Sequence, residues 1–493
     1  MKKQNRIAIL NILSTVILKG MSIFTSSLFS RMLGTSGYGV VRIYTIWVGV
    51  CAIAFSLQTQ GTLVNARVEY PEEEQPKYQS SVMFLSLLAF LFFGAAVLLF
   101  LNPISELLQL EKFVILLILI HAFGSFCLNF LNSKFTYEFK AGRNFSVSTG
   151  VTISTLILSV ILILLMPEEI NYYGRILALS ITYGGLGIIT CAYVLIKGKT
   201  FYNREYWKLC LTLALPVVFY NLSDLLLGQC DQVMLQQMMS DSMVGQYGLA
   251  LLFGGIMFTL FGALNNAWCP FFFEDMKNGR RVEIKAQAKN FLELYTVLSM
   301  GFVLLATEVY HLYASRDFWD GTILIPVFVG SYFLNFLCTF PVNYEYYHKN
   351  TKIEALVTIF ASLVNIGLNY ILIGKIGMMG AALATMISLP AVYAALYLHP
   401  VRSGEGGLSL RHSPVGKVCG CFLCRGSVCH ADTGLVAAAL EHGRCPRCVG
   451  ALPDQKAESI DLVIRGRMPN PTPACIIGDA IRTGMVYNTI GLL

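Results

Sequence analysis

The sequence places several ionisable side chains inside long apolar segments, where a charge requires a partner or a function. Lys19 lies in the apolar stretch 7–30, about eleven residues from either end. That is roughly 16 Å along a helix, too far for its side chain to reach water. A lysine ammonium is a compact positive charge that binds phosphate or pyrophosphate without requiring a fixed geometry. We expect Lys19 to bind an anionic substrate; a structural ion pair is the alternative.

Two arginines follow near the end of that stretch and in the next one. Arg31 and Arg42 both lie towards the expected outer surface, where together they would form an anion site at the exit of a transport path. Each also has a structural explanation. Arg31 could cap a helix C-terminus, and the side chain of Arg42 could extend to the interface.

The stretch 209–231 carries the corresponding acidic groups. Asp224 lies about a turn from the position that an internal repeat makes equivalent to Lys19. It is therefore either a carboxylate that couples transport to a cation or the structural partner of Lys19. Asp231, at the outer end, is a second candidate for ion coupling or gating, or it is simply solvated. Pro216 should break this helix near its middle and provide a hinge.

These residues must be positioned by membrane-spanning helices. Of the 493 residues, 55% are hydrophobic and only 13% are charged, with a mean hydropathy of +0.61. This composition excludes an ordinary cytoplasmic enzyme, a disordered protein and a nucleic-acid-binding protein. Runs of about 20 apolar residues predict an all-α integral membrane protein with twelve spans. The spans are 7–30, 38–60, 80–101, 113–133, 145–166, 174–196, 209–231, 243–268, 290–312, 321–343, 353–372 and 377–399.

The Lys and Arg residues between these spans predict their orientation. With the N-terminus inside, the cytoplasmic loops hold 19 of these residues and the opposite loops hold 5. This excess is typical of cytoplasmic loops. We therefore expect both ends of the membrane unit to face the cytoplasm.

Short matches between the two halves predict an internal repeat. The tripeptide Val-Thr-Ile at 151–153 recurs at 357–359, and the segment 174–178 resembles 380–384 at the same offset. Tyr38-Gly39 likewise matches Tyr247-Gly248. A parallel duplication of this kind gives a six-helix lobe at 1–200 and another at 201–402, with a substrate path between them. Chance similarity between apolar helices is the alternative.

Two motifs resemble those of a known family. Arg31 to Gly39 (RMLGTSGYG) resembles the R-x-L-G-x-x-x-Y-G stretch of polysaccharide exporters, and Asp231 to Leu235 (DQVML), with Gly245 and Tyr247, resembles their D-x-x-M-L and G-x-Y elements. The family is the oligosaccharide flippases of the multidrug/oligosaccharidyl-lipid/polysaccharide exporter superfamily. The resemblance covers residues 1 to about 400. It implies a V-shaped bundle that moves an undecaprenyl-pyrophosphate-linked oligosaccharide across the bacterial cytoplasmic membrane.

This resemblance predicts a transporter and not an enzyme, with the lipid-linked oligosaccharide and membrane lipids as its partners, together with a polysaccharide polymerase and glycosyltransferases. One alternative is a cation-coupled multidrug or metabolite exporter of the same superfamily. A second is a membrane glycosyltransferase or polysaccharide polymerase, although the short outer loops leave little room for a catalytic domain.

Residues 403–493 differ in composition from the rest. Seven of the 14 cysteines lie there, and Arg outnumbers Lys. Cys421, Cys424, Cys445 and Cys448 have the spacing of a four-thiolate zinc site. Either the tail is a zinc-binding appendage, or it results from a frameshifted or mis-joined reading frame. In both cases its weak apolar periodicity predicts disorder. No cofactor is expected in the membrane unit.

Overall fold

The computed structural model describes the backbone of residues 3–348 and 351–398, and the side chains of residues 20–348, 357–388 and 390–392. Within this part of the chain all regular structure is helical, and residues 1–396 form one structural unit. The main helices are α1 (Lys3–Ser56), α2 (Leu63–Glu69), α3 (Gln75–Leu99), α4 (Leu101–Leu108), α5 (Lys112–Tyr137), α6 (Ala141–Leu165), α7 (Tyr172–Gly198), α8 (Arg204–Met238), α9 (Asp241–Lys277), α10 (Arg281–Tyr313), α11 (Ile325–Tyr347), α12 (Thr351–Ile376) and α13 (Met378–Leu398). Short 3₁₀ helices precede α2, α7 and α11.

The all-helical membrane fold predicted from the sequence is confirmed. Ten helices among the described residues are long and apolar enough to cross a membrane. Their outward surfaces carry large exposed apolar side chains, including Leu165, Ile188 and Phe219, as helices facing lipid require. The expected number of spans is twelve. Two of them are joined in α1, and α13 is described over a shorter apolar stretch, so the count of twelve stays a prediction.

Gly34 explains why α1 contains two predicted spans. At this residue the backbone leaves the helix, with φ 65° and ψ −178°. That combination is essentially restricted to glycine, because a side chain would clash with the neighbouring peptide. The glycine of the sequence motif therefore forms the kink between the spans predicted at 7–30 and 38–60.

Helices in the first half approach closely at glycines. A Cβ on Gly124 in α5 would lie 2.1 Å from the carbonyl oxygen of Tyr183 in α7, and one on Gly187 would lie 2.5 Å from the Cα of Gly124. Small residues are needed at such crossings because lipid provides no hydrophobic force between helices, and close packing must hold them together. This contact makes α5 and α7 the central pair of the first half.

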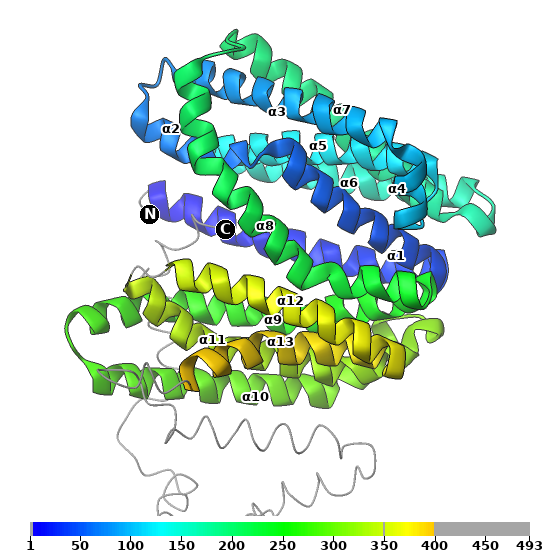
Figure 1. Cartoon of the computed structure of the whole chain (residues 1–493), viewed down its shortest axis with the longest axis vertical. Helices are drawn as coiled ribbons and strands as arrows, with labels where there is room; N and C mark the ends of the chain where they lie inside the picture. Colours follow the sequence, from blue (N-terminus) through cyan, green and yellow to red (C-terminus); the bar gives the residue numbers. More distant parts are fainter. Residues whose placement is uncertain (1–2, 349–350, 399–493) are drawn as a thin grey trace, which may run out of the picture. The chain divides into compact units, whose positions relative to one another are not determined.

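Helix α8 contacts both halves of the unit (Figure 1). Near its start, Trp207 donates a hydrogen bond from Nε1 to the backbone oxygen of Ser81 in α3, 3.2 Å away. Its later part packs against α12 and α9. Pro216 lies between these two regions. The helix continues through this proline, so the predicted break is wrong. A proline removes one N–H and weakens a single turn, which the neighbouring turns and helices can support.

Two glycines of the predicted repeat occupy matching positions. A Cβ on Gly174, in the first turns of α7, would lie 2.6 Å from the backbone nitrogen of Ile163 near the end of α6. A Cβ on Gly380, in the first turn of α13, would lie 2.3 Å from the backbone oxygen of Leu372 near the end of α12. Each glycine thus allows one helix to fold back tightly on its predecessor. The duplication itself stays a prediction.

Candidate functional site

A buried polar cluster connects α1 with α8 and α9. We call it the Arg42 cluster; it consists of Arg42 from α1, Asp231 and Gln232 from α8, and Tyr247 from α9. It lies about two turns from the junction of α8 and α9. Gln232 and Tyr247 are fully buried and Asp231 is 2% exposed. Polar groups at such positions require hydrogen-bond partners.

The hydrogen bonds of the cluster run from one half of the chain to the other. Arg42 donates from Nε and Nη2 to Oε1 of Gln232, at 3.1 and 3.0 Å. Gln232 in turn donates from Nε2 to Oε1 of Gln229, 2.6 Å away. The side-chain amide of Gln232 therefore links the guanidinium of Arg42, in the first half of the chain, to the preceding turn of α8.

Asp231 is held from two directions. The hydroxyl of Tyr247 donates to its Oδ2, and the backbone N–H of Gln232 donates to its Oδ1 at 2.8 Å. No ion pair within 4.0 Å forms between Asp231 and Arg42, although Arg42 is near enough to contribute positive potential. The alternative that Asp231 is merely solvated is wrong, because α9 covers it and provides its donor.

Glycines let the helices approach closely enough to form the cluster. A Cβ on Gly248 would lie 2.9 Å from Nε of Arg42. One turn away, Cβ atoms on Gly39 and Gly245 would lie 1.8 Å from the oxygen of Asp241 and 2.0 Å from the oxygen of Thr35. Gly39 and Gly245 from the two sequence motifs, and Gly248 from the predicted repeat, therefore allow α1 to pack closely against α9.

A second polar network lies beside Asp231, between α8 and the pair α12 and α13. Cys230 donates to Oδ1 of Asn365, and Asn369 donates to the same oxygen at 2.9 Å. Asn365 donates to the hydroxyls of Thr385 and Ser388, each 3.3 Å away. Oδ1 of Asn369 is buried and has no hydrogen-bond partner among the described residues. A carboxylate, amide oxygens and hydroxyls are ligands that suit a hard cation.

Arg31 has a structural contact in this conformation. Its Nη2 donates to the backbone oxygen of Leu312, 2.7 Å away, in the last turn of α10. The carbonyls at a helix C-terminus carry partial negative charge, which a guanidinium stabilises. Of the two explanations offered for Arg31, the structure favours the helix cap.

The remaining predicted residues are not brought together. Asp224 is exposed and forms no ion pair among the described side chains. The side chain of Lys19 lies outside the described residues, so the proposed pairing of the two charges stays a prediction. The four cysteines of the tail, Cys421, Cys424, Cys445 and Cys448, also lie outside them. Among the described residues, no group of three or more His, Cys, Asp and Glu side chains could hold a metal.

No functional role was predicted for four of the residues in these networks, Gln232, Tyr247, Asn365 and Asn369, although the first two lie in the quoted motifs. Two signals were available. Gln232 follows the motif aspartate directly. Asn365 and Asn369 are four residues apart on an otherwise apolar helix, a spacing that puts them on one face. The cross-helix contacts could not be predicted, because the sequence does not give the register of α1 against α8.

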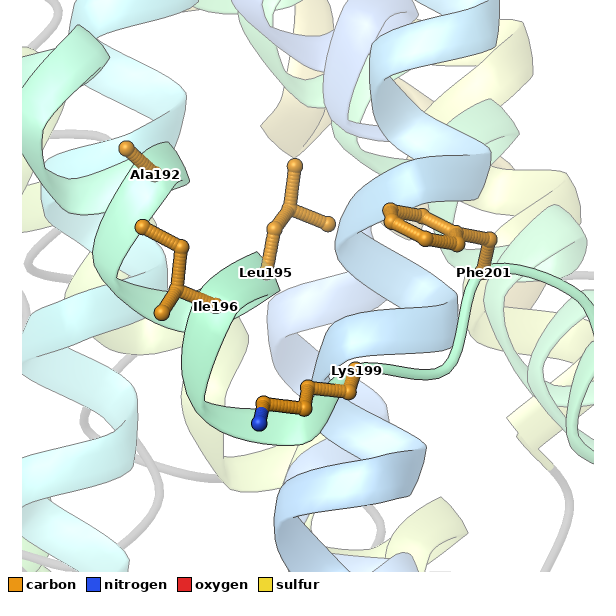
Figure 2. Close-up of a pocket in the computed structure, with 5 residues that line it drawn as sticks. All are labelled: Ala192, Leu195, Ile196, Lys199 and Phe201. Atoms are coloured by element: carbon orange, nitrogen blue, oxygen red, sulfur yellow. The ribbon is translucent and has the colours of Figure 1, made fainter.

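One cavity among the described residues has little capacity to bind a polar ligand. Its volume is about 450 Å³, and Ala192, Leu195, Ile196, Lys199 and Phe201 line it. Figure 2 shows Leu195 and Phe201 pointing towards one another, whereas Lys199 extends away from the phenyl ring. Ile196 is 69% exposed, which is typical of a hollow on a lipid-facing surface.

The fold is similar to that of known transporters. A multidrug resistance MATE family transporter of the MOP superfamily in an inward-facing conformation has a TM-score of 0.62 and 13% identity, over 81% of this chain and 100% of that one. The lipid II flippase MurJ, in an inward closed conformation, has the same TM-score with 19% identity, over 80% of this chain and 88% of that one. At these identities the similarity establishes the fold alone.

In sequence, the chain matches a family model. No curated protein matches the chain significantly. The model described as "Polysaccharide biosynthesis protein" matches residues 6–276, which is more than half of the chain and includes the whole Arg42 cluster. The resemblance inferred from the two motifs is thus confirmed, and the chain belongs to the polysaccharide biosynthesis protein family and has the fold of the MOP superfamily.

Proposed function

We propose that this protein is a membrane transporter, not an enzyme, that flips an undecaprenyl-pyrophosphate-linked oligosaccharide from the inner to the outer leaflet of the bacterial cytoplasmic membrane. The product would supply a polysaccharide polymerase, and glycosyltransferases would supply the substrate. Both ends of the membrane unit would face the cytoplasm, as the distribution of Lys and Arg indicates.

One observation carries this proposal: the family match to polysaccharide biosynthesis proteins spans residues 6–276 in a chain with the fold of the MOP superfamily. The fold alone does not separate a flippase from a drug exporter, because a multidrug transporter matches with the same TM-score. The family match favours the polysaccharide pathway over the cation-coupled exporter. A glycosyltransferase or polymerase finds no support in either comparison.

The Arg42 cluster supports alternating access between two lobes. Its hydrogen bonds join α1, about two turns after the kink at Gly34, to α8, about two turns before its last residue. An outward-open state would have to break them. Hydrogen bonds between neutral and charged partners contribute about 1.5–3 kcal/mol each, a range that conformational exchange can overcome. Pro216 lies between the part of α8 that contacts α3 and the part that contacts α12, and it is the proposed hinge.

For substrate binding, Lys19 is the proposed ligand of the pyrophosphate. Arg42 and Arg31 would be released when the outer contacts open, and both would then be available to an anionic group leaving the path. Asp231 is the proposed coupling site, with the oxygens of Asn365 and Asn369 completing the ligands of a cation. The unpartnered Oδ1 of Asn369 supports this assignment. Asp224 is the second coupling candidate.

The substrate is tested in cells that make the polysaccharide. Depletion of the protein should cause the lipid-linked oligosaccharide to accumulate in the inner leaflet, and resupply of the Arg42→Gln variant should relieve this accumulation less than the wild type does. Sensitivity to drugs should stay unchanged. Normal polysaccharide export together with loss of drug resistance would instead favour the exporter.

A further inference from the structure

A second cavity, of about 290 Å³, lies at the end of the bundle that the charge distribution assigns to the cytoplasm. It is formed by the ends of α2, α5 and α7 and the start of α3. Its lining is polar: Arg67, Glu72, Gln75, Pro76, Gln79, Lys134, Glu138, Lys140 and Lys197. Four cations and two carboxylates give it an excess of positive charge. This cavity is separate from the Arg42 cluster, which lies on α1, α8 and α9 towards the opposite side of the membrane.

Two of the four cations already have partners. Arg67 donates to the backbone oxygen of Tyr137 and lies over the ring of Phe139, 5.1 Å from its centroid. Lys140 forms an ion pair with Glu138. These contacts use one of the two carboxylates, and the other, Glu72, is exposed.

Among the described residues no carboxylate lies within ion-pair distance of the other two cations, although Glu138 is near enough to attract the charge of Lys134. Lys134 is only 3% exposed, yet its ammonium makes no hydrogen bond or ion pair to any described residue. It lies 5.2 Å from the ring centroid of Tyr193, and the ammonium of Lys197 lies 5.8 Å from the same ring. A buried charge without a hydrogen-bonded partner is costly. Here two like charges share one aromatic ring at the edge of a cavity.

We propose that this cavity binds a phosphate group, with Lys134 and Lys197 as its ligands, from either an anionic lipid headgroup or a soluble phosphate ester. A phosphate would satisfy the donors of both ammonium groups and neutralise the excess charge of the lining. Basic pockets between transmembrane helices on the cytoplasmic side suit such headgroups. A cavity of this size is at the lower limit for small-molecule sites, so it fits a headgroup and not an oligosaccharide. The buried Gln79 offers a further amide donor.

The test uses the purified full-length protein and three variants. Lys134→Met and Lys197→Met remove one proposed ligand each. Lys197 is exposed, so its replacement avoids the folding risk at a buried site. Lys199→Met is the matched control, because Lys199 follows on the same helix end but lines the apolar hollow and not this cavity. Binding of phosphatidylglycerol is measured by native mass spectrometry from nanodiscs, with pure phosphatidylcholine as the neutral reference. Binding of inorganic pyrophosphate is measured by calorimetry in neutral detergent.

We expect saturable binding in at least one arm, weakened about tenfold or more by Lys134→Met and by Lys197→Met, which is the loss expected for one charge-assisted contact. The Lys199→Met variant should bind like the wild type. Binding of phosphatidylglycerol alone identifies a lipid headgroup as the ligand, and binding of pyrophosphate identifies a site for soluble phosphates. Absence of binding in both arms, or equal weakening by all three variants, would overturn the proposal.

Discussion

The guanidinium of Arg42 donates two hydrogen bonds to a single oxygen, Oε1 of Gln232, although the two residues are 190 positions apart in the sequence. Gln232 has no exposure to solvent. The contact therefore joins α1 to α8 through an acceptor that water cannot satisfy when Arg42 leaves. A transport cycle that separates these helices must therefore supply another hydrogen-bond donor to Oε1 of Gln232, such as a water molecule that enters between the helices.

The first prediction concerns this contact. Arg42→Gln should destabilise the protein in detergent by about 1–3 kcal/mol, because it removes both charged donors from a buried acceptor. The labelling of a cysteine introduced at Thr35 by an external reagent should increase as α1 and α8 separate. Arg143→Gln is the control, since Arg143 is exposed. Equal stability and labelling in the two variants would show that the contact does not hold the helices together.

The second prediction concerns the crossing of α1 and α9. Gly245→Ala should destabilise the protein by on the order of 1–3 kcal/mol, because its Cβ would lie 2.0 Å from the backbone oxygen of Thr35 and the helices would have to move apart. Gly255→Ala on the same helix meets nothing within 4 Å. This control should be neutral or slightly stabilising, as alanine favours helix. Thermal unfolding measures both, and similar melting temperatures would contradict the crossing.

The third prediction separates the structural and coupling roles of Asp231. Tyr247→Phe removes the hydroxyl that donates to Oδ2, and it should lower the free energy of unfolding by about 1.5–3 kcal/mol because the acceptor is charged. Asp231→Asn keeps an oxygen acceptor for that hydroxyl and should cost less stability. It should nevertheless abolish the dependence of transport on a cation gradient. An Asp231→Asn protein that keeps this dependence would exclude Asp231 as the coupling site.

The fourth prediction concerns Lys19 and Asp224. If the two charges pair, removal of one partner should cost roughly 3–5 kcal/mol, and a double-mutant cycle of Lys19→Ala and Asp224→Ala should give a coupling energy of that order. Stabilities that simply add would show that the two charges act separately and would favour Asp224 as the site of a coupling cation.

The sequence predicted the helices well and their contacts poorly. The expected spans at 113–133 and 174–196 lie within α5 and α7, because long apolar runs have few alternatives to a helix in lipid. The boundaries were less accurate where a helix extends beyond the apolar core. Helix α10, for example, begins at Arg281, nine residues before the predicted span, through polar residues that lie outside the hydrocarbon.

The candidate site was only partly predictable. Arg42 was identified from its charge and Asp231 from its charge and its motif, and both belong to the Arg42 cluster. Their shared neighbour Gln232 is uncharged and gave no comparable signal. Arg31 was identified equally well from the sequence, yet it caps α10. Packing between helices that are far apart in the chain decides which charged side chain is available to a substrate and which one caps a helix.

Transport by reconstituted protein tests the central proposal most directly. Proteoliposomes would contain a fluorescent undecaprenyl-pyrophosphate-linked oligosaccharide in both leaflets, and an impermeant quencher would measure the fraction reached from outside. We predict that the wild-type protein makes nearly all of the lipid accessible over time, whereas Arg42→Gln is slower and the exposed Arg143→Gln equals the wild type. If the wild-type protein leaves the inner half of the labelled lipid protected, as protein-free vesicles do, the protein is not a flippase for this class of lipid.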